Sequence, residues 1–219
     1  MVSWSCQVAY QVYCRRSFNI YNVLLDFLSP HQILYFQELQ KRTQFVISGS
    51  AALAAFDRTV FRGSDCDIYV NPANLDEIAS WLLNAGYCYL TLPTPPSRYI
   101  DKYPNGVVKV ISLERPAVGC AQAATHTVIQ LVVCRWSPAD VILKFHSTVV
   151  MNLISSDAMY CLFPRSTLVD RISYHSPDLD QAAARQKYID VGGLCKLLPQ
   201  WPTPFTANAP LVRVMSGTN

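Results

Sequence analysis

The chain of 219 residues has few charged side chains and no long apolar run. Charged residues make up 15% of the sequence and hydrophobic residues 51%. No apolar stretch reaches the roughly 18 residues that suggest a membrane span, and Met1 to Arg16 lacks the basic, apolar and small-residue order of a secretory signal. We therefore expect an intracellular, cytoplasmic protein with no membrane segment. The high apolar content favours an exposed surface that binds a protein partner.

The sequence also lacks the residue patterns of several common enzyme classes. It has no Walker-type Gly-Lys-Ser or Gly-Lys-Thr, no Gly-x-Ser-x-Gly and no Gly-x-Gly-x-x-Gly. Its 8 cysteines and 4 histidines are scattered without a Cys-x-x-Cys pair, which predicts reduced thiols and no structural zinc site. The net charge of +3 is spread along the chain and neither requires nor excludes an RNA substrate. ATPase, hydrolase and dinucleotide-binding functions therefore lack support.

A chain of this length can bury a good core in one domain. We expect a helical N-terminal segment over 1–28, an α/β domain with a C-terminal helical part over 29–198, and a flexible tail over 199–219. The tail is rich in Pro, Thr, Ala and Asn, a composition common in poorly ordered termini. The expected fold class is α+β, with a small mixed, twisted sheet flanked by helices.

The segment from Phe45 to Val70 carries the clearest chemical pattern. Its first residues are an apolar run, followed by Gly49 and Ser50 and then by short-chained, helix-favouring residues. This order predicts a strand, a tight turn and a helix. Gly49 and Ser50 then lie at a helix N-terminus, where unpaired N–H groups and the positive end of the helix dipole bind phosphate.

Asp65 and Asp67 follow a helix's length later, in a stretch where polar and apolar residues alternate. On a strand, residues two apart project from the same face. Two carboxylates held together need a divalent cation or a shared proton, and hard oxygen ligands favour Mg²⁺ or Mn²⁺. The simpler interpretation stays open: Gly49 then only turns the chain, and the two aspartates only solubilise a strand end.

In this order, Ile47-Ser48-Gly49-Ser50 and Asp65-Cys66-Asp67-Ile68 resemble the signature of the nucleotidyltransferase superfamily. That superfamily includes DNA polymerase beta and small minimal nucleotidyltransferase domains. The resemblance implies a nucleotidyltransferase-like fold in which Gly49 and Ser50 bind the triphosphate of a nucleoside triphosphate. It also implies that Asp65 and Asp67 hold Mg²⁺ or Mn²⁺, and that a nucleotidyl group passes to a hydroxyl of a protein, RNA or small molecule.

The sequence departs from the superfamily at the third carboxylate, which normally comes from a later strand. In the predicted strand Thr127 to Cys134, Gln130 stands where the resemblance expects Asp. An amide cannot act as a base, and general-base assistance is worth about a hundredfold to ten-thousandfold. Glu114 and His146 are alternative substitutes, although Gln130 and His146 also suit ordinary structural roles. A catalytically inactive nucleotide-binding or protein-interaction module therefore remains an alternative, as does a purely structural interaction protein.

Other patterns predict the elements around this segment. A helix with a capping box should begin after Ser29, and a helix from about 179 to 198, interrupted by glycines, should carry Lys187 as a candidate phosphate contact. Further helices are expected at 72–85 and 138–144, and further strands at 87–92 and 107–113. An extra turn is expected around 58–63, and a surface loop at 93–104.

Overall fold

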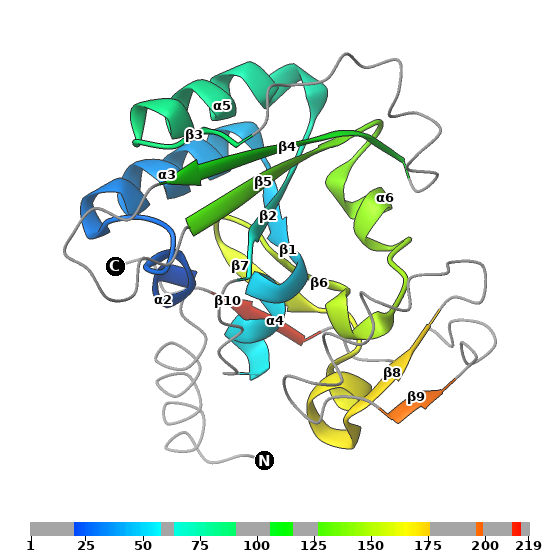
Figure 1. Cartoon of the computed structure of the whole chain (residues 1–219). Coiled ribbons are helices and arrows are strands. Elements are labelled where there is room, and N and C mark those ends of the chain that lie inside the picture. Colours follow the sequence, from blue (N-terminus) through cyan, green and yellow to red (C-terminus); the bar gives the residue numbers. More distant parts are fainter. Residues whose placement is uncertain are drawn as a thin grey trace.

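A computed structural model describes residues 20–57, 64–90, 106–115 and 127–175, together with two strands at 196–198 and 212–215. Its centre is a mixed sheet (Figure 1). The strands are β1 (Val46–Ser48), β2 (Cys66–Val70), β3 (Cys88–Tyr89), β4 (Val107–Arg115), β5 (Thr127–Cys134), β6 (Asn152–Ile154), β7 (Ala158–Cys161) and β10 (Val212–Met215), in the order β10-β7-β6-β1-β2-β5-β4-β3. Only β2 and β5 pair in parallel among these described strands. The mixed sheet and its flanking helices confirm the α+β class.

Helices lie on both sides of the sheet. They are α2 (Ile20–Leu24), α3 (Pro30–Thr43), α4 (Gly49–Asp57), α5 (Leu75–Asn84) and α6 (Pro138–Ile142), with the 3₁₀ turns η1 (Pro72–Asn74) and η3 (Thr148–Val150) and the π-helical turn η4 (Arg165–Asp170). A separate parallel pair consists of β8 (Ile172–Tyr174) and β9 (Lys196–Leu198). None of the helices within the described ranges is long and apolar enough to cross a membrane.

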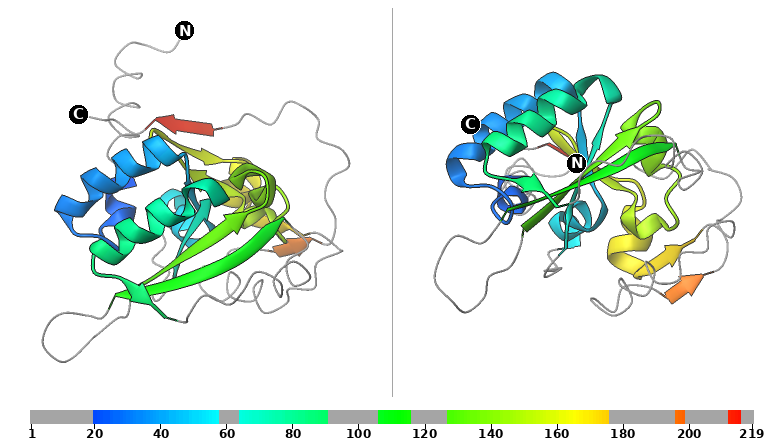
Figure 2. Two further views of the ribbon diagram at one scale, coloured as in Figure 1. Left: turned by 90° about the horizontal axis from the view of Figure 1, so that it is seen from above. Right: turned by 45° about the horizontal axis from the view of Figure 1, so that its top comes forward.

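The main hydrophobic core lies between the sheet and the helices α3 and α5, which run side by side (Figure 2). Because side chains alternate along a strand, every second residue of the central strands enters this core. Ile47, Ile68 and Leu131 are fully buried there, against helix residues such as Phe36 and Leu82. This face of the sheet is therefore closed by apolar packing.

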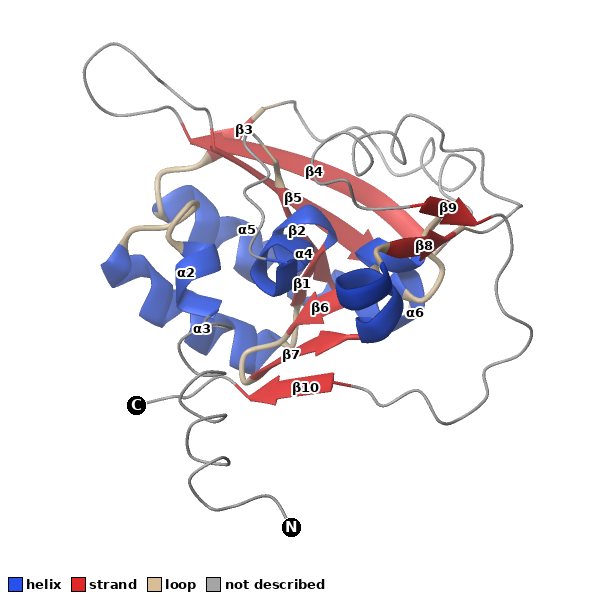
Figure 3. Ribbon diagram, turned by 90° about the horizontal axis from the view of Figure 1, so that it is seen from below, coloured by secondary structure: helices blue, strands red, loops and turns tan. Residues whose placement is uncertain are grey.

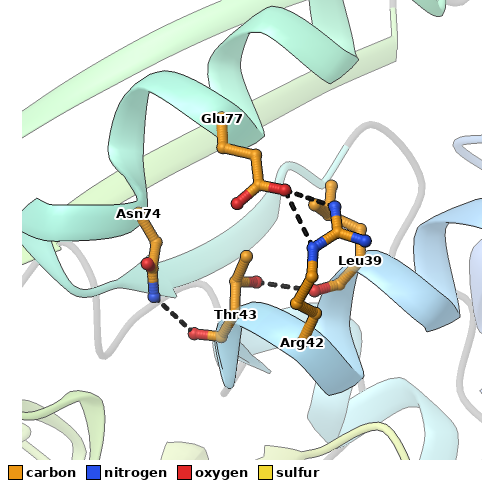
Figure 4. A network of polar contacts seen from close by, with 5 residues as sticks. All are labelled: Leu39, Arg42, Thr43, Asn74 and Glu77. Carbon is orange, nitrogen blue, oxygen red and sulfur yellow. Dashed lines mark hydrogen bonds and ion pairs between the residues drawn. The ribbon is translucent and has the colours of Figure 1, made fainter.

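Polar contacts join the C-terminal end of α3 to the beginning of α5 (Figure 4). Nδ2 of Asn74 donates to the carbonyl oxygen of Thr43 at 2.8 Å, and the Thr43 hydroxyl donates to the carbonyl oxygen of Leu39 at 2.7 Å. Arg42 and Glu77 form an exposed ion pair beside them. These contacts fix the angle between the two helices that cover the apolar face.

The predicted starts of α3 and α6 are confirmed, whereas the helix predicted from residue 72 begins with the 3₁₀ turn η1 and becomes α-helical at Leu75. At α3, the Gln32 N–H donates to Oγ of Ser29 at 3.4 Å, and the Ser29 N–H donates to Oε1 of Gln32 at 3.0 Å, which completes the capping box. At α6, the Asp140 N–H donates to Oγ of Ser137 at 3.2 Å. Short polar side chains thus begin both helices where the sequence predicted.

Part of the predicted N-terminal segment over 1–28 packs into the main core. Ile20, Leu24 and Leu28 belong to the main core, and the Tyr87 hydroxyl donates to the carbonyl oxygen of Phe27 at 2.5 Å. Residues 20–28 are therefore part of the domain, because their apolar side chains complete its core. Residues 1–19 lie outside the described residues.

The C-terminal predictions need correction at two places. The helix predicted up to residue 198 is wrong at Lys196–Leu198, which form the strand β9 paired with β8. These residues lie in the sequence between Gly193 and Pro199, which both disfavour a helix. The predicted tail is wrong at Val212–Met215, whose β-favouring residues form β10 on β7. The rest of both segments, including Lys187, lies outside the described residues.

Smaller differences concern the middle of the chain. The predicted strand 87–92 is shorter, since β3 covers only Cys88–Tyr89 among its described residues. The predicted turn around 58–63 and the predicted loop at 93–104 lie outside the described residues. Four described cysteines, Cys66, Cys88, Cys134 and Cys161, carry free thiols, as expected.

Candidate functional site

The junction of β1 and α4 places a glycine where no other residue fits easily. Gly49 begins α4 immediately after Ser48 and has a φ of 69°, which is in the left-handed region. The first N–H groups of a helix have no partner within it and point beyond its N-terminus. The strand, turn and helix predicted from the sequence are therefore present, with Gly49 and Ser50 at the helix start.

Asp67 lies directly against this helix start. It stands opposite Ser48 in the antiparallel pair of β1 and β2. A Cβ atom added to Gly49 would lie 2.2 Å from Oδ2 of Asp67, closer than a side chain permits. The missing side chain at position 49 therefore makes room for the carboxylate. The two halves of the sequence pattern meet in space.

Polar side chains continue across four neighbouring strands. Ser48, Asp67, Gln130 and Ser112 are consecutive register partners on β1, β2, β5 and β4, and we call these four residues the polar row. Register partners project from the same face of a sheet. Figure 3 shows the four strands following one another, with α4 in front of β1 and β2. The polar row thus occupies the face opposite α3 and α5.

Gln130 connects the row to the second aspartate. Its Nε2 atom donates to Oδ2 of Asp65 at 2.5 Å, and both residues are half-buried. Asp65 directly precedes β2. The structure therefore brings Gln130 beside Asp65 and Asp67.

The electrostatics of Cys66 reflect the closeness of its neighbours. Burial raises the pKa of the Cys66 thiol well above its usual range, and the negative charges of Asp67 and Asp65 raise it further. The thiol itself faces the apolar core. The two carboxylates therefore concentrate negative charge at the N-terminal end of β2, and negative charge attracts a cation.

Carboxylate oxygens are the groups at this site that could hold a Mg²⁺ or Mn²⁺ ion. In nucleotide sites, Mg²⁺ commonly binds one or two carboxylates together with substrate phosphates and water. Asp65 and Asp67 are the two carboxylates that could serve as ligands here. Among the described residues, no three His, Cys, Asp or Glu side chains gather as a metal site by themselves.

His146 lies on the same side of the sheet as the polar row. The ring of the preceding Phe145 is 5.6 Å from the ring of Tyr69, which is two residues beyond Asp67. The turn that follows His146 packs Val149 against Leu53 of α4. His146 is half-buried between these contacts, and its role at the site stays a prediction.

Glu114 lies on the same face of the sheet as the polar row, but it is not a register partner of any residue in the row. It stands opposite Val128, whereas Gln130 stands opposite Ser112.

Ser48 and Ser112 were not predicted as members of the site. Ser112 had a signal in the sequence, because it is a hydroxyl residue within the apolar run of β4. The Ser48 hydroxyl donates to the carbonyl oxygen of Asn152 at 2.5 Å, so its role is to fix β1 to β6.

The comparisons with known proteins give no family for this chain: no family model matches it, and neither does any curated protein or any solved structure. The residues of the polar row and their geometry therefore carry the functional proposal alone.

Proposed function

We propose that the protein is a metal-dependent nucleotidyltransferase-like domain that binds a nucleoside triphosphate with Mg²⁺ or Mn²⁺. It transfers the nucleotidyl group to a hydroxyl of a protein, RNA or small molecule. The observation that carries this proposal is the contact of Asp67 with Gly49, because it joins a carboxylate to a helix N-terminus. A cation and a phosphate group are then bound within one site.

In the proposed reaction, an oxygen of the acceptor hydroxyl attacks the α-phosphorus of the nucleotide. The new P–O bond forms as the bond to the leaving pyrophosphate breaks, and the hydroxyl proton passes to solvent. The N–H groups at the start of α4 would orient the phosphates, and Asp65 and Asp67 would hold the cation. The cation supplies neutralisation of the phosphate charge. Positioning and neutralisation account for most of the expected rate.

Gln130 favours a second candidate function, a module that binds the nucleotide but does not transfer it. The amide donates to Asp65 and cannot take a proton from the acceptor, which supports this alternative. In this second function, the same residues bind the same metal–nucleotide complex. The two functions therefore differ in transfer and not in binding.

Transfer of a radioactive α-phosphate tests the first function. The protein is incubated with each of the four α-labelled nucleoside triphosphates and Mg²⁺ or Mn²⁺, and label is followed onto the chain itself, added RNA and glycerol. We expect label transfer from the natural chain and none from Asp65→Asn combined with Asp67→Asn. The matched control Asp76→Asn changes an exposed carboxylate at the start of α5 and should leave transfer intact. Transfer at the natural rate by the double variant contradicts the proposed site.

A further inference from the structure

An exposed tryptophan with two cations beside it lies just beyond the end of β5. Trp136 follows Cys134, the last residue of this strand, by two positions and is 61% exposed. The guanidinium carbon of Arg135 lies 5.6 Å from the centroid of its ring, and Nζ of Lys144 lies 5.2 Å from it. Both distances are within the range of a cation–π contact. We call Arg135, Trp136 and Lys144 the Trp136 patch.

The structure holds this ring in place although it is exposed. The Arg135 N–H donates to the carbonyl oxygen of Gly106 at 2.8 Å, which ties the backbone before Trp136 to the start of β4. A Cβ atom added to Gly106 would lie 3.6 Å from Cζ3 of Trp136, so the indole packs beside this glycine. Lys144 is itself paired with Asp140 at 2.9 Å. A ligand therefore meets a ring that is already positioned, which lowers the entropy lost on binding.

The Trp136 patch is separate from the polar row. Gln130 stands opposite Asp67 in the parallel pair of β2 and β5, and Trp136 is six residues further along the chain. At about 3.3 Å per residue, this spacing is roughly 20 Å. The charged side chains placed around the ring are two cations and the carboxylate of Asp140, so the patch carries a net positive charge that attracts an anion.

From this arrangement we infer that the Trp136 patch binds a single-stranded nucleic acid. A base stacks on the exposed part of the Trp136 ring, and a phosphate group binds Arg135. Aromatic side chains beside cations bind single strands in this way, because every base has a flat face and every nucleotide a phosphate. The planar guanidinium group also matches the geometry of phosphate oxygens. The inference does not rest on the proposed nucleotide site.

Two other anionic partners suit the patch less well. Recognition of anionic lipids by charge uses clusters of about 4–8 Lys and Arg residues, whereas the patch has two cations, one of which is paired with Asp140. An acidic peptide would pair with Arg135, but exposed ion pairs contribute little. Stacking of one base on an aromatic ring strengthens binding by about tenfold or more. A single strand therefore uses both the ring and the charge.

Fluorescence anisotropy of labelled oligouridylate and oligothymidylate tests this inference with the full-length chain. We expect saturable binding by the natural chain and a loss of about tenfold or more in Trp136→Leu, because the stacking surface is removed. Trp136→Phe keeps an aromatic face and should lose less. Tyr35→Leu changes a 56% exposed aromatic residue on α3 and is the matched control, which should bind as the natural chain does. The two probes distinguish RNA from DNA.

The dependence of the affinity on salt tests the phosphate contact. Arg135→Gln removes one such contact, so the slope of log affinity against log salt concentration should become shallower by about 0.7. The combined variant Asp65→Asn and Asp67→Asn should bind the oligonucleotides like the natural chain. This last result separates the Trp136 patch from the nucleotide site.

The contrary outcomes are equally defined. The inference is overturned if the natural chain binds neither oligonucleotide, or if Trp136→Leu and Tyr35→Leu lose the same affinity. It is also overturned if the patch binds polyglutamate or phosphatidylserine vesicles and no oligonucleotide, which identifies an acidic peptide or a membrane as the partner. If Trp136→Leu does not fold, Arg135→Gln carries the test, and an unchanged salt slope in that variant contradicts the inference.

Discussion

The two faces of the central sheet are formed by alternate residues of the same strands, yet their side chains differ in polarity and in burial. Under α3 and α5, Ile47, Ile68 and Leu131 are 0% exposed and packed on all sides. One residue along the chain, Asp67 and Gln130 remain half-buried on the opposite face. The apolar face contributes most of the buried core, whereas Asp67 and Gln130 are less constrained by packing and are better placed for binding.

The largest expected effect is on stability, from a change on the apolar face. Ile68→Ala removes fully buried methyl groups and should lower the free energy of unfolding by about 2–5 kcal/mol. Asp67→Asn changes the neighbouring residue on the other face and should lower it much less, because the carboxylate is only half-buried. Urea unfolding of both variants measures the difference. Equal losses contradict the division of roles between the two faces.

The next effect compares an ion pair on each side of the sheet. On the side of the polar row, Arg171 pairs with Asp57 of α4, whose side chain is only 5% exposed. Arg171→Ala removes this ion pair from a buried carboxylate and should cost about 3 kcal/mol. Arg42→Ala breaks the exposed pair with Glu77 between α3 and α5 and should cost about 1 kcal/mol or less. Thermal unfolding measures both losses of stability. A similar loss in the two variants shows that the burial of Asp57 does not determine how much its ion pair contributes to stability.

A third pair of variants, at Gly49 and Gly86, separates the effect of backbone strain from the effect of a contact with the Asp67 carboxylate. Gly49→Ala introduces both, because φ is 69° and the new Cβ meets Asp67. Gly86→Ala introduces strain alone, since φ is 96° and the nearest atom is 3.9 Å away. Each should lose about 1–3 kcal/mol of stability, but only Gly49→Ala should also lose binding of a fluorescent nucleoside triphosphate. Unchanged nucleotide binding by Gly49→Ala removes the helix start from the site.

The smallest effect is chemical and leaves stability unchanged. Cys66 lies between the two aspartates in sequence, but its thiol is buried on the apolar face and its pKa is raised by burial first and by Asp67 next. A protonated, buried thiol reacts slowly. Iodoacetamide at pH 8 should therefore modify the exposed Cys88 and spare Cys66, as read by peptide mass spectrometry. Rapid modification of Cys66 argues against the register that places both aspartates on one face.

Local sequence signals predicted most of what positions the site. Ser29 and Ser137 marked helix starts correctly because a capping hydroxyl acts within one turn. Gly49 and the alternation around Asp67 predicted the junction and the shared face, since period and turn chemistry are local properties. These elements were predictable because their causes lie within a few residues.

Contacts between distant segments were not predictable in this way. The strand β9 pairs with β8, and β10 pairs with β7. The residues next to Lys196 and Val212 in the sequence do not indicate these partners, so both strands were missed. The place of Ser112 in the polar row depends on the register of β4 with β5, and strand register is fixed by the partner strand. The sequence likewise suggested Gln130 as the replaced carboxylate without showing that it reaches Asp65.

Thermal unfolding with each nucleoside triphosphate, with and without Mg²⁺ or Mn²⁺, tests the central claim most directly. The natural chain is compared with Asp65→Asn combined with Asp67→Asn, and with the control Asp76→Asn. A ligand at about a hundred times its dissociation constant adds roughly 2.7 kcal/mol to the free energy of unfolding. We predict a metal-dependent rise for the natural chain and the control, and none for the double variant. No rise with any nucleotide, or an equal rise in the double variant, contradicts a metal–nucleotide site at the polar row.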